Sequence, residues 1–351
     1  MSLTLMNAAD VLAQLDTFDT VIDARSESEF ALDHLPGAVN WPTLNDEERK
    51  LIGTMYVQVN QFEAKKRGAA LAARNIAAHI EREVIDKPRE WKPLAYCWRG
   101  GKRSGSLSLV LDQIGFRVTL VEGGYKAFRA AMLLDIPRQV ARLHFQVVCG
   151  TTGSGKTRLL QALAIAGAQV LDLEALANHR SSVLGAIPGL AQPSQKHFDS
   201  LVWDALRGFD TDRPVFVESE SKKVGNVAVP TTLVERMRES PCLDLNLPMD
   251  ERVALLMEDY DFFVKDSAHF CERLDVLAEF RGKAVVQAWK EQVASGNVES
   301  VVRDLLTQHY DPVYLQSMQR NFRQYPQALS IAPSDRSLGA MRQLAEELLK
   351  A

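Results

Sequence analysis

The sequence predicts an α/β protein built from two parallel-sheet domains, the second of which contains a helical insertion. Short apolar segments alternate with helix-forming segments along most of the chain, as in parallel strands joined by helical crossovers. Two glycine-rich loops, at 97–104 and 150–157, each directly follow an apolar segment, and residues of about 250–323 are helical with no strand pattern. We expect domains at 1–138 and 139–351.

The first domain contains three predicted strands, which are the apolar segments Thr20–Ala24, Pro93–Tyr96 and Val118–Val121. Between the first two, a helical turn and a Pro/Gly bend near 33–42 are followed by an alanine-rich segment at about 60–84, which favours helix. The segment Ser104–Ile114 is apolar at helical spacing, and Gly115 is its expected C-cap.

The second domain contains five predicted strands: His144–Cys149, Gln169–Leu173, Pro214–Val217, Cys242–Leu247 and Gln327–Ile331. The charged, helical stretch at about 250–323 precedes the last strand, so we interpret it as an insertion and not as a separate domain. A closing amphipathic helix is expected at Ser337–Lys350.

Composition and charge narrow the class of protein. The chain has 351 residues, 46% hydrophobic and 25% charged, with a net charge of -4, which excludes a uniformly basic nucleic-acid coat. Its four cysteines are scattered without a C-x-x-C pair, so we expect neither a zinc site nor a disulfide framework. No signal peptide and no apolar stretch of the roughly 20 residues that a membrane span needs are visible, so we expect a cytoplasmic protein with no membrane partner.

The first loop has the chemistry of an activated thiol. A thiol is nucleophilic when ionised, and cations, inward-pointing amides and a helix N-terminus all stabilise the thiolate. We therefore predict Cys97 as the catalytic residue, with the alternative that it is a buried and inert cysteine. The expected anion loop around it consists of Arg99, Gly100, Gly101, Lys102, Arg103 and Ser104.

The second loop matches G-x-x-x-x-G-K-[ST], the P-loop pattern, whose backbone amides surround a diphosphate. The predicted diphosphate-binding residues are Gly150, Thr151, Thr152, Gly153, Ser154, Gly155, Lys156 and Thr157. Lys156 is expected to contact the terminal phosphate, and the Thr157 hydroxyl is where Mg²⁺ would bind. A dedicated protein-only metal site is not expected.

An acidic strand end, Glu218 and Glu220, is expected to face the phosphates, with Asp172 as a weaker candidate of the same type. The alternative for each acid is a solvated strand end. A small-molecule kinase is the plainest interpretation of this half, because Leu245–Leu256 resembles the strand–helix step of nucleoside kinases.

The first half resembles the rhodanese domain in order and spacing. The resemblance is carried by the segments Asp23–Arg25, His34–Asn40, Tyr96–Arg103 and Val121–Tyr125. In rhodaneses the cysteine carries sulfur as a persulfide. Here Cys97 and Arg103 are spaced C-x5-R, one residue longer than the common sulfurtransferase loop and equal to the cysteine phosphatase spacing. A phosphatase therefore remains an alternative.

Almost the full length is similar to the bacterial tRNA 2-selenouridine synthases. The resemblance is carried by Gly53–Gly68, Cys97–Ser104, Gln192–Lys196 and Val217–Gly225. It implies conversion of wobble 2-thiouridine, in tRNAs for Lys, Glu and Gln, to S-geranyl-2-thiouridine with geranyl diphosphate and then to 2-selenouridine with selenophosphate. No tightly bound cofactor is implied. The basic residues expected to meet the tRNA backbone are Arg180, Lys196, Lys222, Lys223, Arg320 and Arg323.

The resemblance also implies roles for the two loops. Cys97 would accept or relay selenium, the cations beside it would hold selenophosphate, and Lys156 would stabilise the departing diphosphate. Two other functions remain open: a rhodanese-fused P-loop kinase, NTPase or sulfurtransferase, and a regulatory module in which one loop is only structural.

Overall fold

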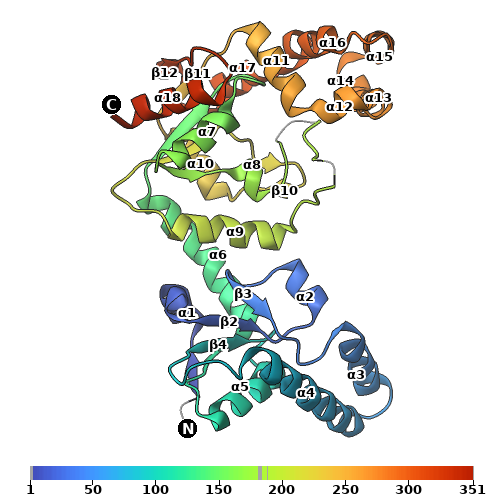
Figure 1. Cartoon of the computed structure of the whole chain (residues 1–351), viewed down its shortest axis with the longest axis vertical. Helices are drawn as coiled ribbons and strands as arrows, with labels where there is room; N and C mark the ends of the chain where they lie inside the picture. Colours follow the sequence, from blue (N-terminus) through green and yellow to red (C-terminus); the bar gives the residue numbers. More distant parts are fainter. Residues whose placement is uncertain (1–2, 181–183, 188, 351) are drawn as a thin grey trace. The chain divides into compact units, whose positions relative to one another are not determined.

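The computed structural model describes residues 3–180, 184–187 and 189–350 (Figure 1). The chain forms two compact units. The first contains Met1–Arg138 together with Pro193–Asp204, and the second contains Gln139–Gln192 and Ala205–Ala351. The predicted α/β class is confirmed in both units, since each is built around a parallel sheet.

The first unit has a five-stranded parallel sheet in the order β1-β5-β4-β2-β3. Its strands are β1 (Thr4–Met6), β2 (Thr20–Asp23), β3 (Ala38–Asn40), β4 (Pro93–Tyr96) and β5 (Thr119–Val121). Its helices are α1 (Ala8–Gln14), α2 (Glu27–Leu32), α3 (Asp46–Gln58), α4 (Gln61–Glu83), α5 (Lys102–Ile114) and α6 (Gly124–Arg142), the last of which continues into the second unit. Ile22, Ala95 and Leu107 lie in a core between β2, β4 and α5.

The predictions for this unit are confirmed with small shifts. The three expected strands are present, the alanine-rich helix is α4, and Gly115 caps α5 with a φ of +113°. Two strands were not predicted. One of them, β3, lies in the expected bend near 33–42, because three residues pair with β2 as the chain leaves the bend.

The second unit has a five-stranded parallel sheet in the order β12-β11-β6-β8-β7. Its strands are β6 (Phe145–Cys149), β7 (Gln169–Leu171), β8 (Val215–Glu218), β11 (Cys242–Leu245) and β12 (Leu329–Ile331), and a small hairpin is formed by β9 (Lys223–Val224) and β10 (Val227–Ala228). The helices outside the insertion are α7 (Lys156–Ile165), α8 (Leu173–Leu176), α9 (Gln195–Arg207, which begins in the first unit), α10 (Thr231–Glu239) and α18 (Leu338–Lys350). Leu159, Phe216 and Met341 share its core.

Three expected strands of this unit are each two residues shorter than predicted. The β7 strand ends at Leu171 because the Asp172 side chain accepts from the Ala175 N–H and caps α8. The β12 strand starts at Leu329, after the 3-10 turn Tyr325–Gln327. The β11 strand ends at Leu245, two residues earlier than predicted. The chain then passes to Pro248, the N-cap residue of the next helix.

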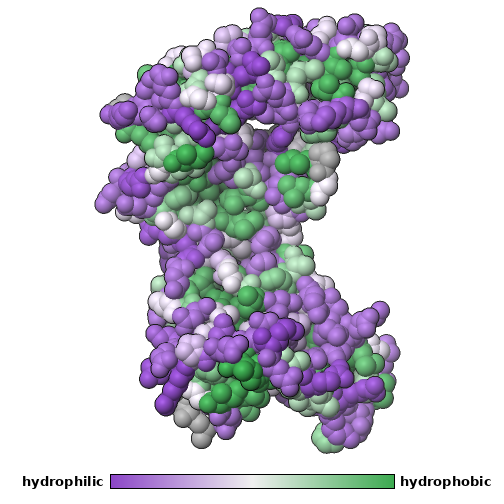
Figure 2. All heavy atoms as spheres, in the orientation of Figure 1, coloured by the Kyte–Doolittle hydropathy of each residue, from purple (hydrophilic) through white to green (hydrophobic). Residues whose placement is uncertain are grey.

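The predicted insertion is helical throughout, and no strand occurs among the described residues between β11 and β12. It contains α11 (Met249–Asp259), α12 (Asp261–Lys265), α13 (Ser267–Leu274), α14 (Ala278–Arg281), α15 (Lys283–Ala294), α16 (Val298–Leu305), the π-helical turn η3 (Leu306–Tyr310) and α17 (Asp311–Asn321). It has a core of its own, which includes Phe270, Trp289 and Val301. Figure 2 shows a largely hydrophilic surface with scattered apolar patches. Across the described part of the chain, no helix has the length and apolar character to cross a membrane.

Candidate functional site

Cys97 lies at the carboxyl end of β4, the central strand of the first sheet, and begins the loop that leads into α5. Its side chain is buried, with 3% of the residue exposed. The Gly101 N–H donates to its Sγ atom at 3.2 Å, and the Ser104 hydroxyl donates at 3.1 Å. Two donors directed at one sulfur stabilise negative charge on it, so the predicted loop geometry around Cys97 is present.

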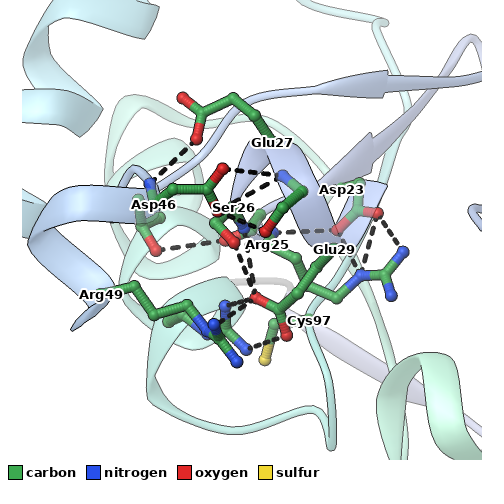
Figure 3. Close-up of polar contacts among 12 residues, drawn as sticks. Asp23, Arg25, Ser26, Glu27, Glu29, Asp46, Arg49 and Cys97 are labelled. Carbon is green, nitrogen blue, oxygen red and sulfur yellow. Dashed lines mark hydrogen bonds and ion pairs between the residues drawn. The ribbon is translucent and has the colours of Figure 1, made fainter. Parts of the chain in front are cut away.

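The three cations of this loop lie in different environments. Arg99 and Lys102 are exposed, whereas Arg103 is half-buried. Arg103 donates from both terminal nitrogens to Glu29 of α2, at 2.5 and 3.2 Å, and Arg49 also pairs with Glu29 at 3.1 Å (Figure 3). Burial of Glu29 acts against ionisation, but the hydrogen bond and charge of Arg103 hold its pKa below the ordinary value. The Arg103 guanidinium is therefore engaged in an ion pair with Glu29, and Arg99 and Lys102 are the exposed cations of the loop.

The N-terminus of α6 packs against the cysteine loop and hydrogen-bonds to its backbone. The Tyr125 N–H donates to the Cys97 carbonyl at 2.8 Å, and the Lys126 N–H donates to the Trp98 carbonyl at 3.1 Å. This contact requires a glycine at 124, where φ is +60° and a Cβ atom would lie 2.2 Å from the Cys97 carbonyl oxygen. Gly124 therefore allows the start of α6 to approach the cysteine loop.

Aromatic stacking holds Trp98 against the same support. The Trp98 ring stacks on Tyr125 with centroids 5.4 Å apart. The Lys196 ammonium lies over the Trp98 ring, 5.9 Å from its centroid. Below Tyr125 lies the guanidinium of Arg25, 4.1 Å from the ring centroid. Arg25 is itself paired with Asp23 in a fully buried salt bridge of 2.6 Å (Figure 3). Trp98 thus contributes to the packing of the loop.

The P-loop leaves β6, the central strand of the second sheet, and enters α7. The Lys156 ammonium donates to the Gly150 carbonyl at 2.7 Å and to the Thr151 carbonyl at 3.4 Å. Burial lowers the pKa of Lys156, while the nearby carboxylates of Glu174 and Glu220 act in the opposite direction. The ammonium is therefore held at the inner side of the loop, as a diphosphate site requires.

Two side chains of the helical insertion fix the P-loop, and no sequence pattern indicated either of them. Arg252 of α11 donates from Nε and Nη2 to the Thr152 carbonyl at 3.0 and 2.7 Å, and it forms a two-pronged ion pair with Asp311 of α17. Tyr314 of α17 accepts from the Gly150 N–H at 2.6 Å, and its hydroxyl also hydrogen-bonds to Ser219 Oγ at 2.9 Å. The insertion therefore holds both the first and the third residue of the loop.

The two acids of the expected acidic strand end lie in different environments. Glu218 is buried and does not line the cleft, and its Oε1 accepts from the Glu174 N–H at 2.9 Å. Burial, together with the neighbouring carboxylates, raises the pKa of Glu218 well above its ordinary value. Glu220 and Glu174 line the cleft beside the P-loop, and Glu174 accepts from the Thr157 hydroxyl at 3.2 Å. Glu174, which the sequence did not single out, is therefore the acid at the expected Mg²⁺ position.

A large cleft lies against the P-loop, with a volume of about 1160 Å³. Of the basic residues predicted to meet tRNA, Arg180, Lys222 and Lys223 line this cleft. Lys196 lies in the first unit over Trp98, and Arg323 pairs with Glu239 at 3.0 Å. Arg158 and Arg238 also line the cleft and were not predicted.

Comparison with known proteins assigns both halves. The model of the rhodanese-like domain matches residues 7–131, and the model of the tRNA 2-selenouridine synthase AAA domain matches residues 143–285. Curated proteins named tRNA 2-selenouridine synthase are similar over most of the chain. The relative from Marinobacter nauticus is 33% identical over 84% of this chain and 87% of its own length. The relative from Sulfurovum sp. is 33% identical over 86% and 89%, and that from Nitrosomonas europaea is 37% identical over 72% and 66%.

The chain belongs to the tRNA 2-selenouridine synthase family. The rhodanese-like match contains the Cys97 loop, and the AAA-domain match contains the P-loop and Arg252. The match to the AAA domain ends before α17, so Asp311 and Tyr314 lie beyond it. In this member of the family, contacts from outside the matched domain therefore help to fix the P-loop.

Gly124→Ala should destabilise the first unit and disturb the cysteine loop. The new Cβ atom would approach the Cys97 carbonyl oxygen to 2.2 Å, and φ at this position is positive. We expect a loss of about 2 kcal/mol or more in the free energy of unfolding, measured in urea. Gly105→Ala in α5 is the matched control, since a Cβ atom there meets nothing within 4 Å and should be neutral or stabilising. Equal stability of the two variants would contradict the close approach.

Tyr314→Phe should weaken the P-loop specifically. The change removes the acceptor of the Gly150 N–H and leaves that amide without this partner, at a cost of about 1–3 kcal/mol. We expect weaker binding of inorganic diphosphate, measured by calorimetry, together with lower stability. Tyr325→Phe is the control, because the Tyr325 hydroxyl donates to Asp244 at 3.4 Å instead of accepting from a loop amide. If Tyr314→Phe bound diphosphate as the control does, Tyr314 would have no role in holding the loop.

Proposed function

We propose that this chain converts 2-thiouridine at the wobble position of tRNA to 2-selenouridine in two steps. In the first step the sulfur of 2-thiouridine attacks C1 of geranyl diphosphate, the C1–O bond breaks, and diphosphate leaves. In the second step the selenium of selenophosphate attacks C2 of the base, geranylthiol leaves, and water cleaves the Se–P bond to release phosphate and leave 2-selenouridine. The relatives that carry the name tRNA 2-selenouridine synthase support the overall conversion. The observation that carries the two-step proposal is one chain with a formed P-loop and a separate thiol loop.

The P-loop suits the first step because charge develops on the diphosphate as the C1–O bond breaks. The Lys156 ammonium already lies at the inner side of the loop, held by two backbone carbonyls. An ammonium and amides positioned before the reaction stabilise a leaving group without reorganising. Lys156 and the loop amides would therefore lower the barrier to departure of the diphosphate.

Oxygen donors that suit Mg²⁺ are present beside the loop. The Thr157 hydroxyl and the Glu174 carboxylate lie 3.2 Å apart and both belong to the cleft wall. Among the described residues, no group of three or more His, Cys, Asp or Glu side chains is arranged to hold a metal ion by itself. Thr157 and Glu174 would hold Mg²⁺ together with the substrate, where the ion would neutralise part of the diphosphate charge.

The thiol loop suits the second step. Two donors at 3.1–3.2 Å stabilise negative charge on the Cys97 sulfur, and Arg99 and Lys102 are exposed beside it. A selenophosphate anion would be attracted by these two cations, and the Cys97 thiol would position its selenium for attack on C2 of the base, with no change of oxidation state. Arg103 is paired with Glu29 and so holds α2 against the loop. It would therefore attract selenophosphate less than Arg99 and Lys102 do.

The cleft beside the P-loop would receive the tRNA. Arg180, Lys222 and Lys223 line it and would meet backbone phosphates, in tRNAs for Lys, Glu and Gln as the family resemblance implies. Each phosphate contact makes binding more dependent on salt, with a log–log slope of about -0.7 to -0.9 per contact. A net charge of -4 is compatible with this because net charge does not report how the charges are distributed, and six Lys or Arg side chains line the cleft.

Lys156→Ala should block the first step. Loss of a charge-assisted contact to the leaving group costs about 1.5–3 kcal/mol, which slows geranylation by roughly 10- to 150-fold. The rate is measured by mass spectrometry of nucleosides from 2-thiouridine tRNA incubated with geranyl diphosphate. Lys283→Ala, at the start of α15, is the matched control for loss of a lysine. Wild-type geranylation by Lys156→Ala would remove the P-loop from this step, and rapid ATP turnover without tRNA would favour an NTPase instead.

Cys97→Ala should block the second step alone. Without the thiol, selenium is not transferred, and S-geranyl-2-thiouridine should accumulate when geranyl diphosphate and selenophosphate are both supplied. Cys271→Ala, a half-buried cysteine of the helical insertion, provides the matched control and should still form 2-selenouridine. An equal loss of geranylation in a folded Cys97→Ala protein would show that the thiol loop is needed for both steps.

A further inference from the structure

A second, smaller cavity lies beside the P-loop in the helical insertion. Helices α11, α12, α13 and α16 and the turn η3 surround it, and its lining includes Leu256, Phe263, Val264, Phe270, Val302 and Leu306. Apart from Thr152 and two tyrosines, every lining side chain is aliphatic, Met or Phe. Much of this lining belongs to the separate core of the insertion, so the cavity is an opening in a hydrophobic core.

This cavity shares part of its wall with the large cleft. Thr152 of the P-loop lines both spaces, and so do Leu256, Tyr260 and Tyr310. A ligand whose phosphates lie on the P-loop amides would therefore have an apolar space next to its phosphate end. An allylic diphosphate has this shape, because a charged diphosphate is joined directly to a hydrocarbon chain.

We propose that this cavity takes the distal end of the prenyl chain of the diphosphate substrate, while the proximal carbons lie along Leu256 and Tyr260 in the large cleft. The inference rests on the proposed use of geranyl diphosphate. Burial of a hydrocarbon chain here removes apolar surface from water, which favours binding. The helical insertion would then supply the specificity of the first step.

The chemistry of the lining excludes more polar occupants. Among the residues that the structure describes, no charged side chain lines the cavity, so a phosphate placed in it would lack a charged partner there. A nucleobase would also leave most of its polar edge unpaired, since only Thr152, Tyr260 and Tyr310 carry polar groups there. A prenyl chain has no polar group to satisfy.

The size of the cavity predicts selection by chain length. Its volume is about 60 Å³, whereas a cavity that holds a benzene ring measures roughly 150 Å³. It therefore accommodates only the end of a chain. A five-carbon chain would leave it empty, and a fifteen-carbon chain would exceed it. Changes in the lining should shift this preference in opposite directions, depending on whether they enlarge or fill the cavity.

Two variants with matched controls test the assignment, assayed with dimethylallyl, geranyl and farnesyl diphosphate on 2-thiouridine tRNA. Leu306→Ala enlarges the cavity, and Leu274→Ala is its control, because both leucines are fully buried and Leu274, in the core of the insertion, does not line the cavity. Val264→Trp fills it, and Val285→Trp is the control: the two valines are 41% and 36% exposed, and only Val264 lines the cavity.

Leu306→Ala should raise the ratio of kcat/KM for farnesyl over geranyl diphosphate by about tenfold, and Val264→Trp should lower the ratio for geranyl over dimethylallyl diphosphate by a similar factor. Both controls should keep the wild-type ratios, and all four proteins should bind inorganic diphosphate alike. If Leu306→Ala fails to fold, the exposed Val264→Trp decides alone. If the wild type geranylates tRNA and the two cavity variants keep its ratios, only the cavity assignment is overturned. Absence of any prenyl transfer by the wild type would overturn the proposed function as well.

Discussion

Both reactive loops depend on one constraint, which is their position after the central strand of a five-stranded parallel sheet. Cys97 follows β4 and Gly150 follows β6, and each strand is paired on both sides. A central strand fixes the point at which its loop begins, and the following helix presents its N-terminus to the same space. The loop amides are thereby aimed before any ligand arrives. In the first sheet a loop amide donates to the Cys97 sulfur, and in the second the loop carbonyls hold the Lys156 ammonium.

The helical insertion has two roles in this account. It fixes the P-loop through Arg252 and Tyr314, which hold the carbonyl of Thr152 and the amide of Gly150. It also forms the apolar cavity that shares Thr152 with the loop. The ion pair between Arg252 and Asp311 joins the first and last helices of the insertion, α11 and α17. Phosphate binding and chain selection would therefore be coupled through the same helices.

The sequence predicted both loops because their chemistry resides in consecutive residues. It also predicted the central strands and the helical insertion, since buried strands are uniformly apolar and the insertion has helical spacing. It did not predict Arg252, Tyr314 or Glu174, each of which acts through a partner distant in sequence. Glu218, which was expected to face the phosphates, is buried and accepts from the Glu174 amide, a contact that no local pattern indicates. Nor did any pattern indicate that Pro193–Asp204 belongs to the first compact unit, where Lys196 lies over Trp98.

The central claim is that the two loops perform separate and successive steps. The most direct test supplies tRNA that already carries S-geranyl-2-thiouridine, together with selenophosphate, to the Lys156→Ala protein and measures 2-selenouridine by mass spectrometry of the nucleosides. Because the diphosphate has already left, the account predicts formation of 2-selenouridine at close to the wild-type rate. Failure of the folded variant to release the geranyl group and incorporate selenium would contradict the account, since the P-loop lysine would then be required in both steps.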